Sequence, residues 1–336
     1  MDHTLAPIAI FVYNRPEHTV RTLEALAANP EARSSTLYIF ADGPKEGISQ
    51  TKLDEIYALR EAIRSQPWCG KVVIREQASN KGLARSIREG VTEVIQAHGK
   101  VIVLEDDIVT SPGFLSYMNK ALIHYEEEEK VMHISGYIPD INQRRLPETF
   151  FLTFMSCWGW ATWASRWTAF QDDSAALYQR LLNEKKLEDF NLNGAIKFSN
   201  YLKGNLTGRH NSWAIKWFAS IFFNEGLCLY PRQSLVQNIG FDGSGSHYTQ
   251  KTTKVDPMTV KSLLSEIDID RSQDIAEHRL ARNALTHFYI YQNHYSLPHV
   301  LRVNLRWVKQ RLLFVKEYLQ PPKALLKHAN SSRIHA

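Results

Sequence analysis

One short segment constrains the fold of this 336-residue chain more than any other. Four consecutive apolar residues, from Val101 to Leu104, run directly into three acids, Glu105, Asp106 and Asp107. An apolar run of this kind is typical of a parallel strand buried on both faces. The three carboxylates would then stand together at its C-terminal end, where open α/β sheets bind their ligands. Clustered like charges repel one another, and a divalent cation or a metal–diphosphate complex would relieve that repulsion.

The acids also have a simpler interpretation. Acidic residues after a strand are often part of a solvated loop or of a helix start. Here Ser111-Pro112 follows closely and resembles a helix N-cap with proline at the first helical position. The rest of the sequence has to decide between a helix cap and a ligand site.

Strand and helix patterns alternate through the first hundred residues. Compact apolar runs predict four strands, at 8–13, 37–41, 71–75 and 101–104. Apolar residues at helical spacing predict helices between them, around 20–27, 56–63 and 83–95. This order predicts an α/β fold whose mostly parallel sheet has right-handed crossovers and flanking helices. All four strands would then end at the same edge of the sheet.

That edge would be a nucleotide site, but not one of two common kinds. A dinucleotide-binding fold requires Gly-x-Gly-x-x-Gly after its first strand, and Tyr13-Asn14-Arg15-Pro16 contains no glycine. A phosphate-binding loop requires Gly-Lys-Ser/Thr, and Lys81-Gly82 has the reverse order.

Composition is that of an ordinary globular protein, with 44% apolar and 22% charged residues. No opening stretch pairs a basic start with an apolar core and a small-residue cleavage site, so we expect no signal peptide. No window approaches about 18 apolar residues, so we expect no transmembrane helix. The three cysteines, Cys69, Cys157 and Cys228, lie far apart and in no metal-ligand spacing. We therefore expect reduced thiols and a cytoplasmic protein.

Three regions follow from the change in character along the chain. Residues 1–108 would form one half of a domain, with the predicted nucleotide site, and 109–250 the other half of the same domain. The second half includes a polar helical stretch at 174–205, an apolar helix at 213–223, a strand at 226–230 and a glycine-rich segment at 238–247. Residues 251–336 would form a helical C-terminal region.

The end of that region is basic and amphipathic. From residue 299 onward there are eight Lys or Arg residues and one acid, so the tail carries +7 of a chain whose net charge is +5. Apolar residues from Leu301 to Leu319 recur every three or four positions and predict one helical stripe. Such a helix either lies on an anionic membrane surface, here the inner face of the cytoplasmic membrane, or packs on the protein itself or on a partner subunit. Nothing in the pattern predicts nucleic-acid binding.

Four motifs in a fixed order resemble the GT-A glycosyltransferases. Each follows a predicted strand or opens a predicted helix: Asn14-Arg15-Pro16, Ala41-Asp42-Gly43, Asn80-Lys81-Gly82-Leu83-Ala84-Arg85 and Glu105-Asp106-Asp107. Within that fold class the sequence is most similar to the N-acetylglucosaminyltransferase I-like group and to bacterial family 2-like sugar transferases. The resemblance runs from residue 5 to about 250 and implies a Rossmann-like GT-A fold that binds a nucleotide-sugar donor and a glycan or lipid-linked glycan acceptor. It implies that 1–108 is the nucleotide-sugar-binding half and 109–250 the acceptor-binding half.

The resemblance also implies roles for individual residues. In the donor site, Tyr13, Asn14 and Arg15 would line the nucleoside pocket and Asp42 would accept from the base. The other donor contacts would come from Asn80, Lys81, Gly82, Arg85, Glu105 and Asp106. Asp107 would bind Mn²⁺ or Mg²⁺ directly, because both are hard ions that take oxygen ligands and bridge diphosphates. His247, late in the chain, would complete the metal shell.

Several of these residues have structural alternatives. Asp42 precedes Gly-Pro and is favoured at the start of a turn for its own backbone contacts. Arg85 would otherwise be a solvated surface residue, and His247 a surface histidine on a glycine-rich loop.

The tryptophans carry the same ambiguity. Trp158, Trp160, Trp213 and Trp217 occupy motif positions where the family builds its acceptor site, and aromatic faces pack well on sugar rings. Large apolar side chains mostly pack in protein cores, which is the interpretation we prefer for the neighbouring Trp163 and Trp167.

The catalytic base is the least determined residue. Direct inverting transfer requires a carboxylate that takes the proton of the acceptor hydroxyl. In the N-acetylglucosaminyltransferase I pattern an aspartate follows the tryptophan of the second motif, but here Ala214 follows Trp213. Asp172, Asp173, Glu225 and Asp242 remain. We favour Asp242 because it lies on the segment that carries His247, with a turn aspartate as the alternative and the stereochemistry left open.

Three functions are compatible with this sequence. The leading one is a metal-dependent glycosyltransferase of bacterial surface polysaccharide synthesis, such as lipopolysaccharide. The second is a sugar-nucleotide-forming nucleotidyltransferase, which would usually carry a glycine-rich basic loop after its first strand. The third is a binding module without catalytic activity, which the missing acid at Ala214 keeps open.

Overall fold

The computed structural model describes residues 5–243, 256–270 and 273–292. It contains one eight-stranded sheet with the order β3-β2-β1-β4-β8-β6-β9-β7, and a two-stranded sheet of β10 and β5. The strands are β1 (Ile8–Val12), β2 (Thr36–Ala41), β3 (Lys71–Glu76), β4 (Lys100–Glu105), β5 (Ile108–Thr110), β6 (Val131–Ser135), β7 (Thr149–Leu152), β8 (Trp160–Trp163), β9 (Leu227–Pro231) and β10 (Val236–Asn238).

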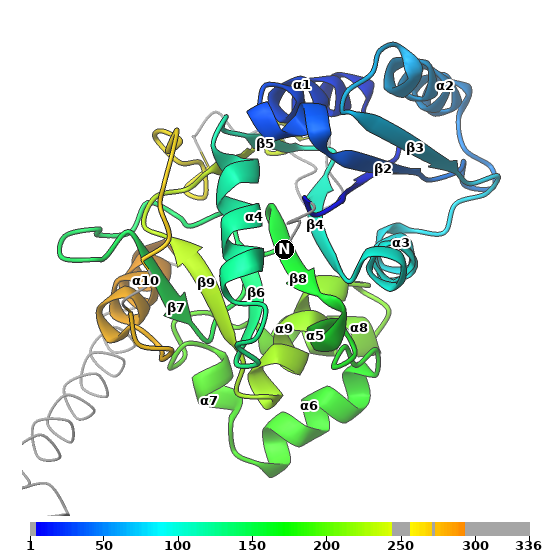
Figure 1. Ribbon diagram of the computed structural model, residues 1–336. Coiled ribbons are helices and arrows are strands. Elements are labelled where there is room, and N and C mark those ends of the chain that lie inside the picture. The colour runs from blue at the N-terminus through cyan, green and yellow to red at the C-terminus, as the bar shows by residue number, and fades with distance from the viewer. Residues whose placement is uncertain (1–4, 244–255, 271–272, 293–336) are drawn as a thin grey trace, which may run out of the picture.

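Helices surround this sheet on both faces (Figure 1). They are α1 (Pro16–Ala27), α2 (Gln50–Arg64), α3 (Leu83–His98), α4 (Phe114–His124), α5 (Ala164–Trp167), α6 (Ser174–Asn183), α7 (Leu187–Phe190), α8 (Ser199–Leu206), α9 (Trp213–Phe223) and α10 (Arg279–Gln292), with a 3₁₀ turn η1 at Pro30–Ser34. The four predicted strands and the three helices between them are confirmed, with ends that differ by a few residues.

Strand direction agrees with the predicted fold class. β1 pairs in parallel with β2 and with β4, and β2 pairs in parallel with β3. Only β8 and β7 run against the other strands of the large sheet. The result is a mostly parallel α/β sheet with flanking helices, and it agrees with the Rossmann-like GT-A fold that the resemblance implied.

The two faces of the sheet bury different residues of the same strand. In β1, Ala9 and Phe11 face a core shared with α3 and α9, whereas Ile8, Ile10 and Val12 face a core shared with α1, α2 and α4. Since successive side chains of a strand point to opposite faces, a strand covered on both sides must be apolar throughout. This explains why the strands of the parallel half appear in the sequence as continuous apolar runs.

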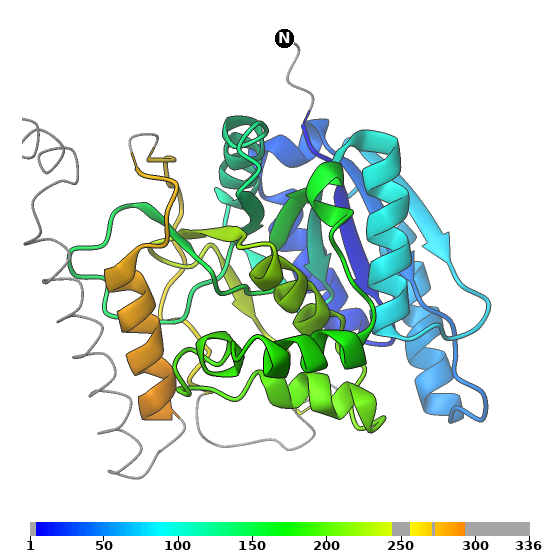
Figure 2. The same cartoon turned by 90° about the horizontal axis from the view of Figure 1, so that it is seen from below.

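The C-terminal part lies beside the last strand. Helix α10 packs near β7, at the end of the sheet opposite β3 (Figures 1 and 2). Within the predicted helical region 251–336, α10 is the only helix that the structure describes, and 256–270 and 273–278 are irregular. The basic stripe at 301–319 falls outside the described residues, so membrane association stays a prediction. None of the described helices combines the length and the apolar character needed to cross a bilayer.

Candidate active site

The loop after β1 and the acids after β4 meet at the C-terminal edge of the sheet. The two strands are neighbours in parallel register, with Phe11 opposite Glu105. Arg15 reaches across this gap and binds two of the three acids. Its Nη2 donates to Asp107 Oδ2 at 2.9 Å, and its Nε donates to Asp106 Oδ2 at 3.3 Å, with a further ion pair to Asp106. We call Arg15, Asp106 and Asp107 the edge cluster.

The edge cluster is mostly removed from solvent, and this shapes its protonation. Side-chain exposure is 17% for Arg15, 8% for Asp106 and 13% for Asp107. Burial alone would lower the pKa of Arg15, but the two carboxylates more than offset it and the pKa is raised. Burial raises the pKa of Asp106, and Arg15 opposes that rise. The pKa of the adjacent Glu105 is raised to about 8, first by burial and then by repulsion from Asp107 and Asp106.

The acids do not cap a helix. Strand β5 comes between them and α4, which begins at Phe114 with Gly113 at its N-cap and no side-chain cap. The prediction that Ser111 caps this helix is wrong, and its buried Oγ has no hydrogen-bond partner among the described residues. The carboxylates are therefore available for another role.

The start of the glycine-rich segment closes one side of the edge cluster. Strand β10 pairs with β5, which places Asn238 opposite Ile108, and the Ile239 amide donates to the Asp107 carbonyl at 2.9 Å. At Gly240 a Cβ atom would lie 2.3 Å from Asp107 Oδ2 and 3.1 Å from Arg15 Nη1. Only glycine fits there without a shift of its neighbours.

A histidine that sequence reasoning missed joins this region. His18 Nε2 lies 3.1 Å from Asp242 Oδ2, and a positive charge on His18 would lower the pKa of Asp106. The predicted catalytic residue Asp242 is thus close to the edge cluster, with a side chain 42% exposed. The available signal was the position of His18 three residues after Arg15, because residues at that spacing share one face of a helix.

Asp42 organises the loop that precedes α3. Its Oδ1 accepts from the amides of Gly43 and Lys81, and its Oδ2 accepts from the Gly82 amide and from Asn80 Nδ2, at 2.8–2.9 Å. The turn interpretation is confirmed by the Gly43 contact. Recognition of a base by Asp42 stays a prediction, and in this structure both carboxylate oxygens hold the loop.

The other residues predicted for the donor site lie in two places, the loop after β1 and the start of α3. Asn14 Nδ2 donates to Glu55 Oε2 at 3.0 Å, which holds the loop after β1 against α2. Lys81 and Arg85 both bind Glu89, at 2.9 Å and 2.6 Å, and the Arg85 side chain is 59% exposed. These two cations lie at the start of α3. Tyr13 follows β1 directly, and burial raises the pKa of its hydroxyl.

Three of the four predicted acceptor tryptophans are core residues. Trp160 and Trp217 are 0% exposed and Trp213 is 4% exposed. The Trp160 ring stacks between Trp213 and His133, and Trp217 Nε1 donates to His133 Nδ1 at 3.3 Å. These three offer almost no surface to a sugar in this structure.

Trp158 differs from the other three. It precedes β8 at the same edge as the acids, is partly buried, and packs edge-on against Tyr137 and Phe241. It keeps its place as the predicted acceptor contact. Core packing, expected for Trp163 and Trp167, is confirmed, with exposures of 2% and 6%.

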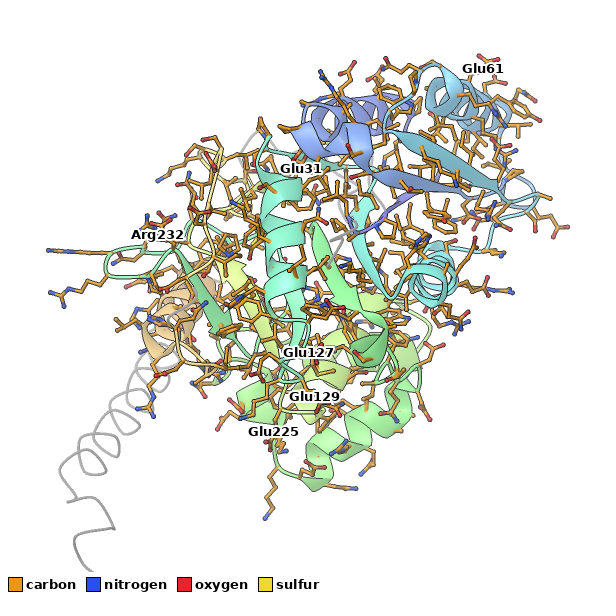
Figure 3. The ribbon with its side chains drawn as sticks, viewed as in Figure 1. Glu31, Glu61, Glu127, Glu129, Glu225 and Arg232 are labelled. Atoms are coloured by element: carbon orange, nitrogen blue, oxygen red, sulfur yellow. The ribbon has the colours of Figure 1, made fainter. Side chains whose placement is uncertain are left out.

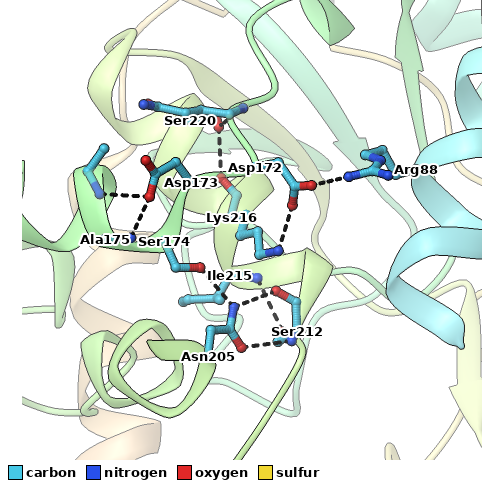
Figure 4. A network of polar contacts seen from close by, with 12 residues as sticks. Arg88, Asp172, Asp173, Ser174, Ala175, Asn205, Ser212, Ile215, Lys216 and Ser220 are labelled. Carbon is cyan, nitrogen blue, oxygen red and sulfur yellow. Dashed lines mark hydrogen bonds and ion pairs between the residues drawn. The ribbon is translucent and has the colours of Figure 1, made fainter. Parts of the chain in front are cut away.

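A second group of ion pairs lies where α3, α6 and α9 approach one another (Figure 4). Asp172 binds Lys216 Nζ at 2.6 Å and also pairs with Arg88. We call Arg88, Asp172 and Lys216 the helix cluster. Asp172 and Lys216 of this cluster line a hollow of about 540 Å³, which is also lined by Asp173 and His210.

The other candidate bases have structural positions. Asp173 caps α6 by accepting from the amides of Ala175 and Ala176. Glu225 precedes β9, which runs in the same direction as β4, so it lies at the edge opposite the acids. Figure 3 shows Glu225 near Glu127 and Glu129. We exclude Glu225 as the base on this ground.

The edge cluster fits a divalent ion in part. Asp107 offers a carboxylate oxygen, and Asn238 Oδ1 lies beside Gly240, so the nearby donors are the hard oxygens that Mg²⁺ and Mn²⁺ prefer. Among residues 5–243, 256–270 and 273–292 no group of three His, Cys, Asp or Glu side chains could hold a metal. The predicted ligand His247 falls outside these ranges. The remaining ligands would come from a bound diphosphate.

Comparison with known proteins assigns no family to the chain and finds only distant structural likeness. No protein-family model matches the sequence, and no curated protein matches it. Among solved structures, S. aureus TarS is 14% identical with a TM-score of 0.28 over 42% of this chain and 23% of TarS. The galactosyltransferase LgtC, in complex with donor and acceptor sugar analogues, is 10% identical with a TM-score of 0.32 over 52% of this chain and 65% of LgtC.

A third similar structure is UDP-glucose pyrophosphorylase complexed with UDP-glucose. It is 10% identical with a TM-score of 0.33 over 68% of this chain and 90% of that one. The matched region spans less than two thirds of TarS and of LgtC. Likeness at this level carries no inference about activity, which has to be argued from the site itself.

Proposed function

We propose that the protein is a glycosyltransferase that moves a sugar from a nucleotide-diphosphate donor to a hydroxyl of a glycan acceptor. The edge cluster is the observation that supports this most. A buried carboxylate, a half-buried one and an arginine stand at the C-terminal edge of a mostly parallel sheet, where ligands of such sheets bind. Arg15 Nη1 is buried and has no hydrogen-bond partner among the described residues, so one donor remains for an anion.

The reaction would be one displacement at the anomeric carbon. The acceptor oxygen forms a bond to that carbon while the bond to the diphosphate oxygen breaks, and the hydroxyl proton passes to a carboxylate. A divalent cation, when bound with the donor, would offset the charge that develops on the leaving diphosphate. Asp107 would hold that cation, and Arg15 would bind the diphosphate oxygens.

Asp242 is our proposed base. Its contact with His18 keeps its carboxylate near the edge cluster, and its exposed side chain can reach an acceptor that approaches from solvent. An inverting outcome follows from direct displacement. We expect Asp242→Asn to lower transfer about 100-fold with little change in donor binding, and the anomeric configuration of the product, determined by NMR, tests the stereochemistry.

Donor binding is the first experiment. UDP, GDP and dTDP, and their sugar nucleotides, would be added with and without Mn²⁺ while the unfolding temperature is followed. A ligand at a hundredfold excess over its Kd stabilises the native state by about 2.7 kcal/mol. We expect nucleotides of one base to stabilise the wild type, and Mn²⁺ to add a further stabilisation that Asp107→Ala loses. If no nucleotide stabilises the wild type, the proposal is refuted.

Two other functions are separated by turnover assays. Consumption of a nucleoside triphosphate together with a sugar 1-phosphate would indicate a nucleotidyltransferase. Tight metal–nucleotide binding without hydrolysis or transfer would indicate a binding module. The role in bacterial surface polysaccharide synthesis is part of our proposal and rests on the sequence resemblance.

A further inference from the structure

Arg15 already binds the carboxylate that would hold a metal ion at this site. Asp107 Oδ2, an oxygen that such an ion would take, already accepts from Arg15 Nη2 at 2.9 Å. Gly240 packs against the same oxygen, so the cluster is closed on that side. The side chains of Arg15 and Asp107 are only 17% and 13% exposed, so water does little to solvate the carboxylate. The guanidinium of Arg15 is the positive charge that balances it.

The charges of the edge cluster suit a cation and a diphosphate together better than a cation alone. One arginine and two carboxylates sum to −1. A divalent ion added alone would stand beside the guanidinium in a poorly hydrated place, where repulsion between like charges is strong. A sugar nucleotide brings two negative charges with it. The buried Arg15 Nη1, which has no partner among the described residues, is a donor that those oxygens can take.

We propose that Arg15 is the counter-ion of Asp107 in the donor-free protein and that it makes metal binding depend on the diphosphate. When the diphosphate arrives, the guanidinium moves its hydrogen bonds from Asp107 to the phosphate oxygens, and Asp107 Oδ2 becomes free for the metal. This inference rests on the proposed function, because it takes a nucleotide diphosphate as the ligand.

The test measures two affinities that should change in opposite directions. Binding of Mn²⁺ alone to the full chain is followed by the loss of the free-ion EPR signal, and binding of UDP, GDP and dTDP without metal by tryptophan fluorescence. We expect Arg15→Met to bind Mn²⁺ at least tenfold more tightly than the wild type and the nucleotide at least tenfold more weakly. Equal or weaker Mn²⁺ binding by Arg15→Met would overturn the inference.

Further variants distinguish the proposed effect from a folding defect of Arg15→Met. Arg15→Met leaves the carboxylates of Asp106 and Asp107 without their partner. Arg15→Met with Asp106→Asn restores the net charge of −1 and retains Asp107. We expect this double variant to show the same gain in Mn²⁺ affinity, and adding Asp107→Asn to abolish it. Arg21→Met, at an exposed position of the same helix, is the matched control and should bind as the wild type does.

The outcomes separate this inference from the proposed function. If no nucleotide binds the wild type under any condition, the proposed function fails, whatever the Mn²⁺ result. If a nucleotide binds and supports transfer but Arg15→Met gains no affinity for Mn²⁺, only the counter-ion role fails. A gain in Mn²⁺ affinity together with a loss of nucleotide affinity supports both.

Discussion

The edge cluster and the helix cluster both pair arginine with carboxylate, and their side chains differ in exposure to solvent. In the edge cluster the three side chains are 8–17% exposed, whereas Arg88 and Asp172 of the helix cluster are 40% and 43% exposed. The same chemical pair therefore has different consequences. At the sheet edge the charges depend on one another because water cannot replace a lost partner, and between the helices water can.

The largest expected difference is in activity. We predict that Asp107→Asn lowers transfer at least 1,000-fold, because the variant loses metal-dependent stabilisation that amounts to several kcal/mol. Asp172→Asn should change the rate about tenfold or less, because we assign this residue to holding Arg88 and Lys216. Initial rates with a saturating donor measure both. If the two variants lost activity to a similar extent, Asp172 of the helix cluster would replace Asp242 as the proposed base.

The next difference is in stability. Removing one partner of a buried ion pair leaves an uncompensated charge, so Arg15→Met should lower the free energy of unfolding by about 3–5 kcal/mol. Arg88→Met should cost about 1 kcal/mol or less, because its pair with Asp172 is partly exposed. Urea unfolding at pH 7 measures both values. If Arg88→Met lowered the free energy of unfolding as much as Arg15→Met does, the difference in burial between the two clusters would not explain their energetics.

Groups at the two clusters should make contributions to the free energy of unfolding that depend on pH in opposite directions. The pKa of Glu105, beside the edge cluster, is raised from 4.5 to about 8, so the folded protein keeps a proton that the unfolded chain loses. Stability from this group is full below pH 4.5 and is lost as the pH rises to about 8. The pKa of Asp172 is lowered, against the effect of its burial, by Lys216 and Arg88, so its contribution is present above the ordinary value and lost as the pH falls further.

The variant Glu105→Gln isolates the contribution of Glu105 to the pH dependence of stability. The variant should be about as stable as the wild type near pH 5 and more stable than it near pH 8, by the order of a few kcal/mol. Urea midpoints at the two pH values measure the change, with Glu61→Gln on the exposed side of α2 as the control. A wild type whose stability does not fall over this range would show that Glu105 is ionised in the folded state.

The smallest expected effect is at Lys216. Its side chain is 11% exposed, but its partner Asp172 also binds Arg88 and is itself accessible to water. We expect Lys216→Met to lower the free energy of unfolding by about 1 kcal/mol. If Lys216→Met lost as much stability as Arg15→Met, water would compensate a lost partner in the helix cluster no better than in the edge cluster.

The parallel half of the fold could be predicted from the sequence because its signals are local. Strands β1 to β4 each contain a compact apolar run, the apolar residues of the helices between them have helical spacing, and turn residues such as Asp42-Gly43 separate the elements. The antiparallel strands β7 and β8 gave no such signal. The predicted aromatic segment contains β8, whose tryptophans could not be assigned to core or cleft because burial depends on packing partners far along the chain.

The same limit explains the site. The acids and Arg15 could be placed at one edge from strand order alone. Their direct contact joins residues 91 and 92 positions apart and depends on the register of β1 against β4. Likewise, the pairing of His18 with Asp242 results from the return of the chain through β10, which no local pattern indicates.

The short ladder of β5 and β10 sets which parts of the chain can change length. Since β10 fixes Gly240 against Asp107 through the pairing of Asn238 with Ile108, one residue inserted between 236 and 240 would displace the glycine from the acid. Insertions after 243 would leave that pairing untouched. Relatives of this protein should therefore vary in the number of residues after this point and keep a constant spacing before it.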